Sequence, residues 1–107
     1  MENEKDFFLE TKKKTEISKK KQTKEPNLYK VILLNDNYTT MDFVVDILVK
    51  VFNKEPKEAT AIMLDVHNKG KGVCGVYTYD IAITKIKQVE SLANSQQFPL
   101  RCSYEKA

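Results

Sequence analysis

Residues 28–45, LYKVILLNDNYTTMDFVV, place a strand, a polar turn and the start of a helix in direct succession. The first seven are rich in residues that favour strands, and the Asn35-Asp36-Asn37 cluster that follows them favours a turn. Residues 39–42, TTMD, fit a capping box, with Thr39 as the helix N-cap and Asp42 three residues later. A helix is therefore predicted to about residue 53, with an apolar stripe formed by Met41, Val44, Val45, Leu48 and Phe52.

The middle of the chain predicts a second helix and a second strand. Pro56 suits the first turn of a helix, where its missing N–H costs nothing, and Gly70 suits the left-handed position at the helix C-terminus. Residues 72–78, GVCGVYT, follow as a strand. The helix between Pro56 and Gly70 has one apolar face, formed by Ala59, Ile62, Met63 and Val66.

The last third of the chain predicts one more helix and one more strand. Thr78 caps a helix that has Asp80 in its first turn and an apolar stripe of Ala82, Ile86, Val89 and Ala93. Residues 98–104, FPLRCSY, alternate as a strand that lies at a sheet edge or begins after Pro99. The order β-α-α-β-α-β predicts an α+β domain, in which three helices pack on one face of a three-stranded, mainly antiparallel sheet.

Length and composition restrict the class of protein. The chain has 107 residues, of which 41% are hydrophobic and 31% charged, so it suits one small domain rather than a cofactor domain beside a substrate domain. No apolar stretch approaches the roughly 18 to 20 residues of a membrane span, and the N-terminus lacks the pattern of a secretory signal. We therefore expect a cytoplasmic protein.

The sequence contains few residues that suit a metal site or a redox site. Cys74 and Cys102 are too far apart in the sequence for a redox CxxC motif. With His67 as the only histidine, they cannot complete a four-ligand zinc site. In a reducing compartment we interpret both cysteines as small buried apolar residues rather than as a disulfide. Neither a metal nor a cofactor is expected.

The first 26 residues differ in composition from the rest. They hold 8 lysines and 6 acidic residues, with lysine runs at 12–14 and 19–21 and no apolar periodicity. This pattern favours a disordered N-terminal extension over 1–26 and a folded domain over 27–107. The lysines suit either a solvated tail or an arm that neutralises nucleic-acid phosphates. The second interpretation is weakened because residues 27–107 hold 10 basic and 9 acidic residues, a net charge of only +1, which is too little for a basic binding face.

The sequence contains no clear set of catalytic residues. A hydrolytic triad would need His67 as its base, with Ser91, Ser95 or a cysteine as nucleophile, and none of these lies at a diagnostic spacing. The Asn35-Asp36-Asn37 cluster has two interpretations: turn and cap residues, or, together with His67, the polar rim of a small apolar pocket. His67 is likewise either a structural or a ligand-binding histidine. We predict that the protein is not an enzyme.

Three stretches together resemble a known family. They are residues 29–45, YKVILLNDNYTTMDFVV, residues 59–78, ATAIMLDVHNKGKGVCGVYT, and residues 99–107, PLRCSYEKA. From Pro26 to Ala107 the sequence is similar to ClpS, the bacterial N-end-rule adaptor of the Clp protease. The resemblance implies a fold like the C-terminal domain of the ribosomal stalk protein, and an N-terminal extension that the unfoldase engages.

The resemblance also implies a substrate site. Asn35, Asp36 and His67 would bind the α-amino group of a substrate's first residue. Such a group is an ammonium with three donors, to which an aspartate offers charge while an amide and a neutral imidazole offer acceptors. The side chain of that residue would enter a hydrophobic pocket lined by Met41, Val44, Met63, Val66 and Leu100, with Asn37 and Thr39 at the rim.

The function that the resemblance implies is that of an adaptor. It would bind proteins whose first residue is Leu, Phe, Tyr or Trp and deliver them to a Clp AAA+ unfoldase and protease. Walls of methionine and valine give a Lys or Asp head group no partner. The partner would be the N-terminal domain of a ClpA- or ClpC-type unfoldase, docked around Tyr38, Asp80 and Lys85. The alternative is a small nucleic-acid- or ribosome-associated basic protein that acts through the lysine-rich tail.

Overall fold

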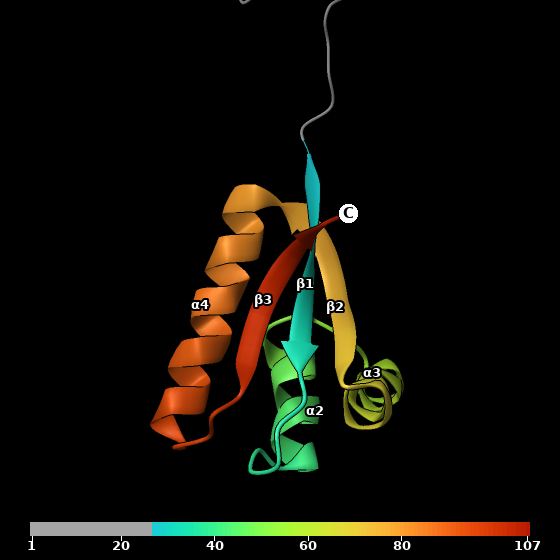
Figure 1. Cartoon of the computed structure of the whole chain (residues 1–107), viewed down its shortest axis with the longest axis vertical. Coiled ribbons are helices and arrows are strands. Elements are labelled where there is room, and N and C mark those ends of the chain that lie inside the picture. Colours follow the sequence, from blue (N-terminus) through green and yellow to red (C-terminus); the bar gives the residue numbers. More distant parts are fainter. Residues whose placement is uncertain (1–26) are drawn as a thin grey trace, which may run out of the picture.

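The structure, a computed structural model, describes residues 27–107 and has the predicted α+β architecture (Figure 1). The extension predicted over 1–26 lies outside the described residues. No helix within 27–107 is long and apolar enough to cross a membrane. The elements follow the predicted order: β1 (Leu28–Leu34), α2 (Met41–Lys50), α3 (Pro56–Lys69), β2 (Lys71–Thr78), α4 (Tyr79–Ser95) and β3 (Arg101–Lys106).

The sheet is antiparallel throughout, with β1 in the centre between β2 and β3. β3 begins at Arg101 and lies at an edge, which confirms the prediction drawn from Pro99. The pairing of β1 with β2 shifts register between Val31 and Ile32, so that Cys74 is an extra residue on β2. Cys74 is nevertheless fully buried, as part of the hydrophobic core.

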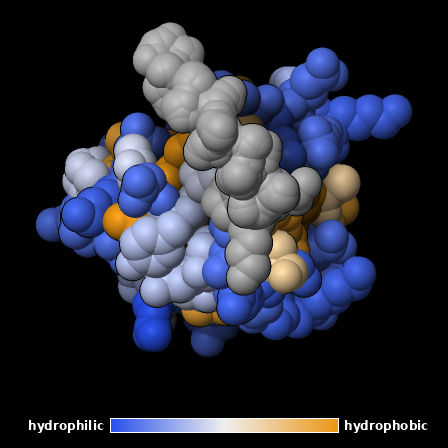
Figure 2. Space-filling model, turned by 90° about the horizontal axis from the view of Figure 1, so that it is seen from above, coloured by the Kyte–Doolittle hydropathy of each residue, from blue (hydrophilic) through white to orange (hydrophobic). Residues whose placement is uncertain are grey.

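Three tyrosines hold together the end of the molecule where β1 begins. Tyr29 of β1, Tyr79 of α4 and Tyr104 of β3 meet edge to face, with ring centroids 5.6 to 5.7 Å apart. Figure 2 shows this end, where weakly polar and hydrophobic side chains adjoin within a mainly hydrophilic surface. The start of β1 is therefore fixed to both the last helix and the last strand.

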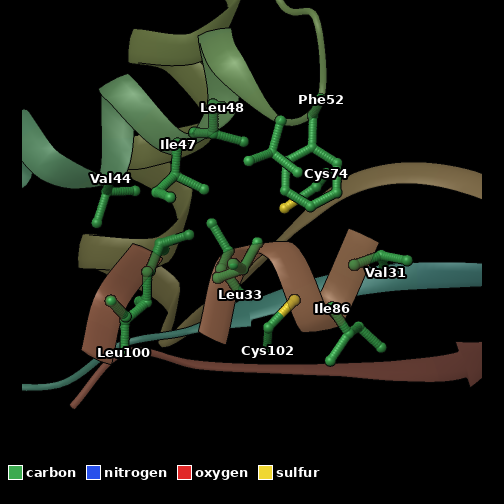
Figure 3. Close-up of a cluster of buried hydrophobic side chains, with 14 of the residues drawn as sticks. Val31, Leu33, Val44, Ile47, Leu48, Phe52, Cys74, Ile86, Leu100 and Cys102 are labelled. Atoms are coloured by element: carbon green, nitrogen blue, oxygen red, sulfur yellow. The ribbon is translucent and has the colours of Figure 1, made fainter. Parts of the chain in front are cut away.

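The hydrophobic core lies between one face of the sheet and the three helices. Figure 3 shows Ile47 and Leu48 of α2 facing Leu33 of β1, with Leu100 and Cys102 on the sheet side. Leu33 and Leu48 are fully buried, and Ile47 is 2% exposed. Burying a side chain of this size contributes about 1.5 to 3 kcal/mol, so this contact fixes α2 over the sheet.

The buried face of α2 differs from the predicted stripe. Val44, Leu48 and Phe52 are buried as predicted, whereas Met41 is 45% exposed and Val45 is only half-buried. Ile47, outside the predicted stripe, takes their place in the core. The core face thus runs through 44, 47, 48, 51 and 52, which leaves Met41 free at the N-terminal end of the helix.

The N-cap of α2 is Thr40, so the predicted cap at Thr39 is wrong. Thr40 Oγ1 accepts the N–H of Phe43 at 3.2 Å. Thr39 cannot serve because its N–H and its hydroxyl both donate to the Asp36 carboxylate, each at 2.7 Å. The helix also ends earlier than predicted, at Lys50, and Asn53 adopts a left-handed φ of 57° in the turn that follows.

The other two helices agree more closely with the sequence. Pro56 stands in the first turn of α3, and Gly70 ends it with a left-handed φ of 90°. Thr78 occupies the N-cap position of α4, although its side chain makes no capping hydrogen bond. The predicted apolar stripe of α4 is buried in full, at Ala82, Ile86, Val89 and Ala93.

The outer face of the sheet carries no helix, yet Ile32 on this face is only 2% exposed. Ile32 points away from the core because side chains alternate along a strand, and both of its neighbours face the helices. Lys71 of β2 and Glu105 of β3 form an ion pair of 3.2 Å. Their partners on β1 are Leu34 and Lys30, so the ion pair crosses β1 at the level of Ile32. We attribute the low exposure of Ile32 to the aliphatic stems of these two side chains.

Candidate functional site

A pocket of about 410 Å³ lies beyond the end of β1, between the N-terminus of α2 and the last turns of α3. The loop after β1 forms its rim, and α2 and α3 form its walls. The lining residues are Asn35, Asp36, Asn37, Tyr38, Thr39, Thr40, Met41, Val44, Met63, Val66 and His67.

The local structure that assembles this pocket centres on Gly70. Its left-handed conformation ends α3 and turns the chain into β2, which pairs with β1. The Gly70 carbonyl then accepts the N–H of Asn35 at 2.9 Å. This bond ties the loop after β1 to the end of α3, and so brings His67, about one turn before Gly70, to the same pocket as Asn35.

Asp36 organises the loop at the rim. Its Oδ1 accepts the N–H groups of Tyr38 (2.8 Å) and Thr39 (2.7 Å), and its Oδ2 accepts the Thr39 hydroxyl. Partial burial alone would raise the pKa of Asp36, but the hydrogen bonds from Thr39 and Tyr38 outweigh it and lower the pKa below its ordinary value. A carboxylate offers about four acceptor positions, so about one remains on Oδ2 for a ligand.

The pocket has an apolar floor and a polar rim. Val44, Met63 and Val66 are nearly buried, at 3 to 9% exposed. Met41 is 45% exposed at the mouth, and His67 is exposed on α3. A ligand with a charged, donor-rich group and an apolar side chain fits this pocket, because the charged group meets the polar rim and the apolar side chain meets the apolar floor.

The described residues offer no sign of a reactive centre beside this pocket. Within 27–107 no three His, Cys, Asp or Glu side chains gather as a metal site. Both cysteines are free and buried, and burial raises the pKa of the Cys102 thiol to about 12. Burial raises the pKa of the Cys74 thiol further still. A protonated thiol is a poor nucleophile, so neither of these two cysteines is activated for nucleophilic attack.

The structure brings together nearly all the residues that the sequence assigned to a substrate site. The α-amino trio and six of the seven side-chain pocket residues line this one pocket. Leu100 does not line it: this residue is buried in the core and borders a separate cavity between α4 and β3. Two lining residues, Tyr38 and Thr40, were not assigned to the pocket. Neither residue was among those that the family resemblance carried over to the pocket, and no local pattern in the sequence marks them as lining it.

The three residues assigned to unfoldase docking do not form one patch. Tyr38, 77% exposed, follows the end of β1 and lines the pocket. Asp80 lies near the other end of β1, because Thr78, two residues earlier, pairs with Leu28, the first residue of that strand. Lys85 is half-buried: its Nζ donates to the Val51 carbonyl at 2.7 Å and lies 5.8 Å from the centre of the Tyr77 ring.

Comparison with known proteins assigns the chain to a family. The family model described as "ATP-dependent Clp protease adaptor protein ClpS" matches residues 24–103. The chain belongs to the ClpS family. The ClpS adapter of Syntrophus aciditrophicus is 54% identical over 106 residues, which are 99% of each chain. The ClpS adapter of Acetivibrio thermocellus is 61% identical over 94 residues, 88% of this chain and 91% of its own.

A solved structure supports the same assignment for this ClpS chain. The structure of Agrobacterium tumefaciens ClpS2 bound to L-phenylalaninamide has a TM-score of 0.75 and 38% sequence identity, and the match covers 78% of this chain and 100% of the other. The family and the α+β fold are therefore those that the sequence predicted. ClpS is a family of protease adaptors, so the class of function is adaptor rather than enzyme.

Proposed function

We propose that this ClpS-family chain binds the first residue of substrate proteins. The α-amino group meets Asn35, Asp36 and His67, and an apolar side chain enters the pocket. The observation that carries this proposal is the polar rim placed directly over an apolar floor. L-phenylalaninamide, the ligand of the related ClpS2, combines the same two features: a free α-amino group and an aromatic side chain.

Simple energetics are consistent with useful affinity. Each hydrogen bond to a charged group contributes about 1.5 to 3 kcal/mol, and burying a Leu or Phe side chain adds roughly the same. Micromolar binding requires about 8.2 kcal/mol. Two or three such bonds and one buried side chain reach this range. Leu, Phe, Tyr and Trp are the proposed first residues, since the walls offer a charged head group no partner.

The bound substrate is then delivered to a Clp AAA+ unfoldase of the ClpA or ClpC type. The family description supports a Clp protease as the destination. We keep Tyr38, Asp80 and Lys85 as the proposed docking residues. Tyr38 and Asp80 are exposed near opposite ends of β1, so they would contact the unfoldase at two separate points rather than as one patch. Lys85 is half-buried and ties α4, the helix that carries Asp80, to the end of α2.

Fluorescence anisotropy with short labelled peptides tests the binding step. The peptides differ only at the first residue, which is Leu, Phe, Met, Ile or Lys, and each is also made with an acetylated N-terminus. We expect tight binding of the Leu and Phe peptides only, and its loss on acetylation, because the acetyl group removes the ammonium. Weak and equal binding of all the peptides would overturn the proposal.

A further inference from the structure

Two further hollows lie along the seam between α2 and α4, away from the core. One has a volume of about 720 Å³ and extends from Thr40 to Leu92 and Phe98. The other, about 550 Å³, continues along the seam to Thr84 on α4. They share Lys50 and Leu92, so they form one continuous groove. The binding of a substrate's first residue does not use it.

This groove is continuous with the first-residue pocket through Thr40, which lines both. Thr40 is the N-cap of α2 and lies where the first-residue pocket adjoins the groove. Met41 and Val44 face the pocket, whereas Asp42 and Phe43 face the groove. A peptide whose first residue fills the pocket, and which continues past Thr40, enters the groove.

The groove presents an apolar strip to the solvent. Phe43 and Phe98 pack against each other with ring centroids 4.9 Å apart, and both are only half-buried. Leu92, across from α2, is 41% exposed, and Val49 is half-buried. These four side chains leave apolar surface exposed where a ligand side chain would cover it.

We infer that the groove between α2 and α4 binds an apolar side chain at the third to fifth position of the substrate. The inference rests on the proposed function, because the first residue must anchor the peptide in the pocket. An extended chain rises about 3.3 Å per residue, so these positions lie about 7 to 13 Å beyond the first. Phe43 lies only about 4.5 Å along the helix axis from Thr40, which places the apolar strip within that reach.

Calorimetric titration of the full chain tests the inference. The ligands are leucyl-alanine amide and six-residue peptides that begin with Leu, carry either Phe or Ser at position three, four or five, and are otherwise alanine. For at least one position we expect the Phe peptide to bind about tenfold more tightly than its Ser partner, a difference of about 1.4 kcal/mol. Leucyl-alanine amide, which is too short to reach the groove, binds without this gain.

Leu92→Ser removes the most exposed aliphatic side chain of the apolar strip and leaves the first-residue pocket, which Leu92 does not line, unchanged. We expect this variant to lose the Phe advantage, to within about twofold, while its affinity for leucyl-alanine amide stays that of the wild type. Leu64→Ser is the matched control, because Leu64 is 44% exposed on α3 and lines neither hollow. This control should keep the full advantage. Equal loss in both variants would overturn the inference.

Three other outcomes would also overturn it. Equal affinity for the Phe and Ser peptides at all three positions would show that the groove holds no substrate side chain. A Phe advantage that survives N-terminal acetylation would show a separate site that does not depend on the pocket. An advantage that appears only after Phe7→Ser and Phe8→Ser are both introduced would assign the groove to the chain's own N-terminal segment. Failure of leucyl-alanine amide to bind the wild type would instead refute the proposed function, and this inference with it.

Discussion

Asp36 combines two roles that a sequence pattern presents as alternatives. As a turn residue, it accepts two backbone N–H groups and the hydroxyl of Thr39. As a charge, it lines the pocket beside Asn35 and His67. The two roles are compatible because the loop uses about three of the four acceptor positions of a carboxylate. Removing the whole side chain would therefore mix a change in the loop with a change in ligand binding.

Asp36→Asn separates these two roles. The amide oxygen of asparagine still accepts the backbone N–H groups of the loop, but the negative charge is lost. We expect the fold to remain and the affinity for a Leu-first peptide to fall by roughly tenfold to a hundredfold, the range for a hydrogen bond to a charged group. Anisotropy measures this change. Asp65→Asn, an exposed carboxylate on α3 outside the pocket, is the control and should bind as the wild type.

The lowered pKa of Asp36 also predicts how stability depends on pH. The folded state favours the charged form, so the stabilisation is complete above the unfolded pKa of about 3.9 and is lost as pH falls through the lower folded pKa. Thermal unfolding from pH 6 to pH 2 should show a steeper loss of stability in the wild type than in Asp36→Asn. Parallel curves for the two proteins would contradict this assignment.

At the scale of the elements, Lys85 connects α4 to the end of α2. Its Nζ donates to the Val51 carbonyl, one of the carbonyls that a helix end leaves without a partner within the helix. Lys85→Ala should lower the free energy of unfolding by about 1.5 kcal/mol, since hydrogen bonds to charged groups contribute about 1.5 to 3 kcal/mol. Lys87→Ala, exposed two residues later, should change it by less than about 0.5 kcal/mol. Urea titrations that show equal losses in both variants would contradict this role.

Two glycines between α3 and β2 should respond differently to substitution by alanine. At Gly70 an added Cβ meets nothing within 4 Å, so Gly70→Ala costs only the strain of a left-handed φ, about 1 to 2 kcal/mol. At Gly72 the Cβ would lie 2.8 Å from Val66 Cγ2 and 3.1 Å from the Ile62 carbonyl oxygen. Because Val66 is a pocket wall, we expect Gly72→Ala to weaken peptide affinity as well as stability. Gly70→Ala should reduce stability alone, and equal effects on affinity would refute this difference.

Local sequence patterns predicted correctly those elements whose apolar residues repeat regularly and whose ends offer only one candidate cap. The stripe of α4 repeats at helical spacing and is buried along its whole length. The start of α2 could not be placed in the same way, because Thr39 and Thr40 are both good caps and only the bond from Thr39 to Asp36 selects the second. Family resemblance, rather than periodicity, carried the prediction of the pocket. Its residues come from three segments that meet only in the folded chain.

At the scale of the whole molecule, the two ends of the central strand are separated. The pocket follows Leu34, whereas residues 1–26 join the folded part beside Leu28, near the tyrosine cluster. Seven strand residues at about 3.3 Å each place these ends about 20 Å apart. The folded part also holds only one more basic than acidic residue, which disfavours nucleic-acid binding by this part. We therefore propose that residues 27–107 bind the substrate without the help of residues 1–26, and we expect the first 26 residues to act in delivery.

A chain that begins at residue 27 tests this division of roles. Its affinity for a Leu-first peptide should match that of the full chain to within about twofold, because every residue that lines the pocket is kept and the truncation lies at the far end of β1. Calorimetry of both proteins with the same peptide measures this. In a degradation assay with a Clp unfoldase and protease, the truncated chain should bind the substrate but deliver it poorly. A tenfold loss of peptide affinity would show instead that residues 1–26 form part of the binding site, and unchanged delivery would show that the unfoldase needs only the folded part.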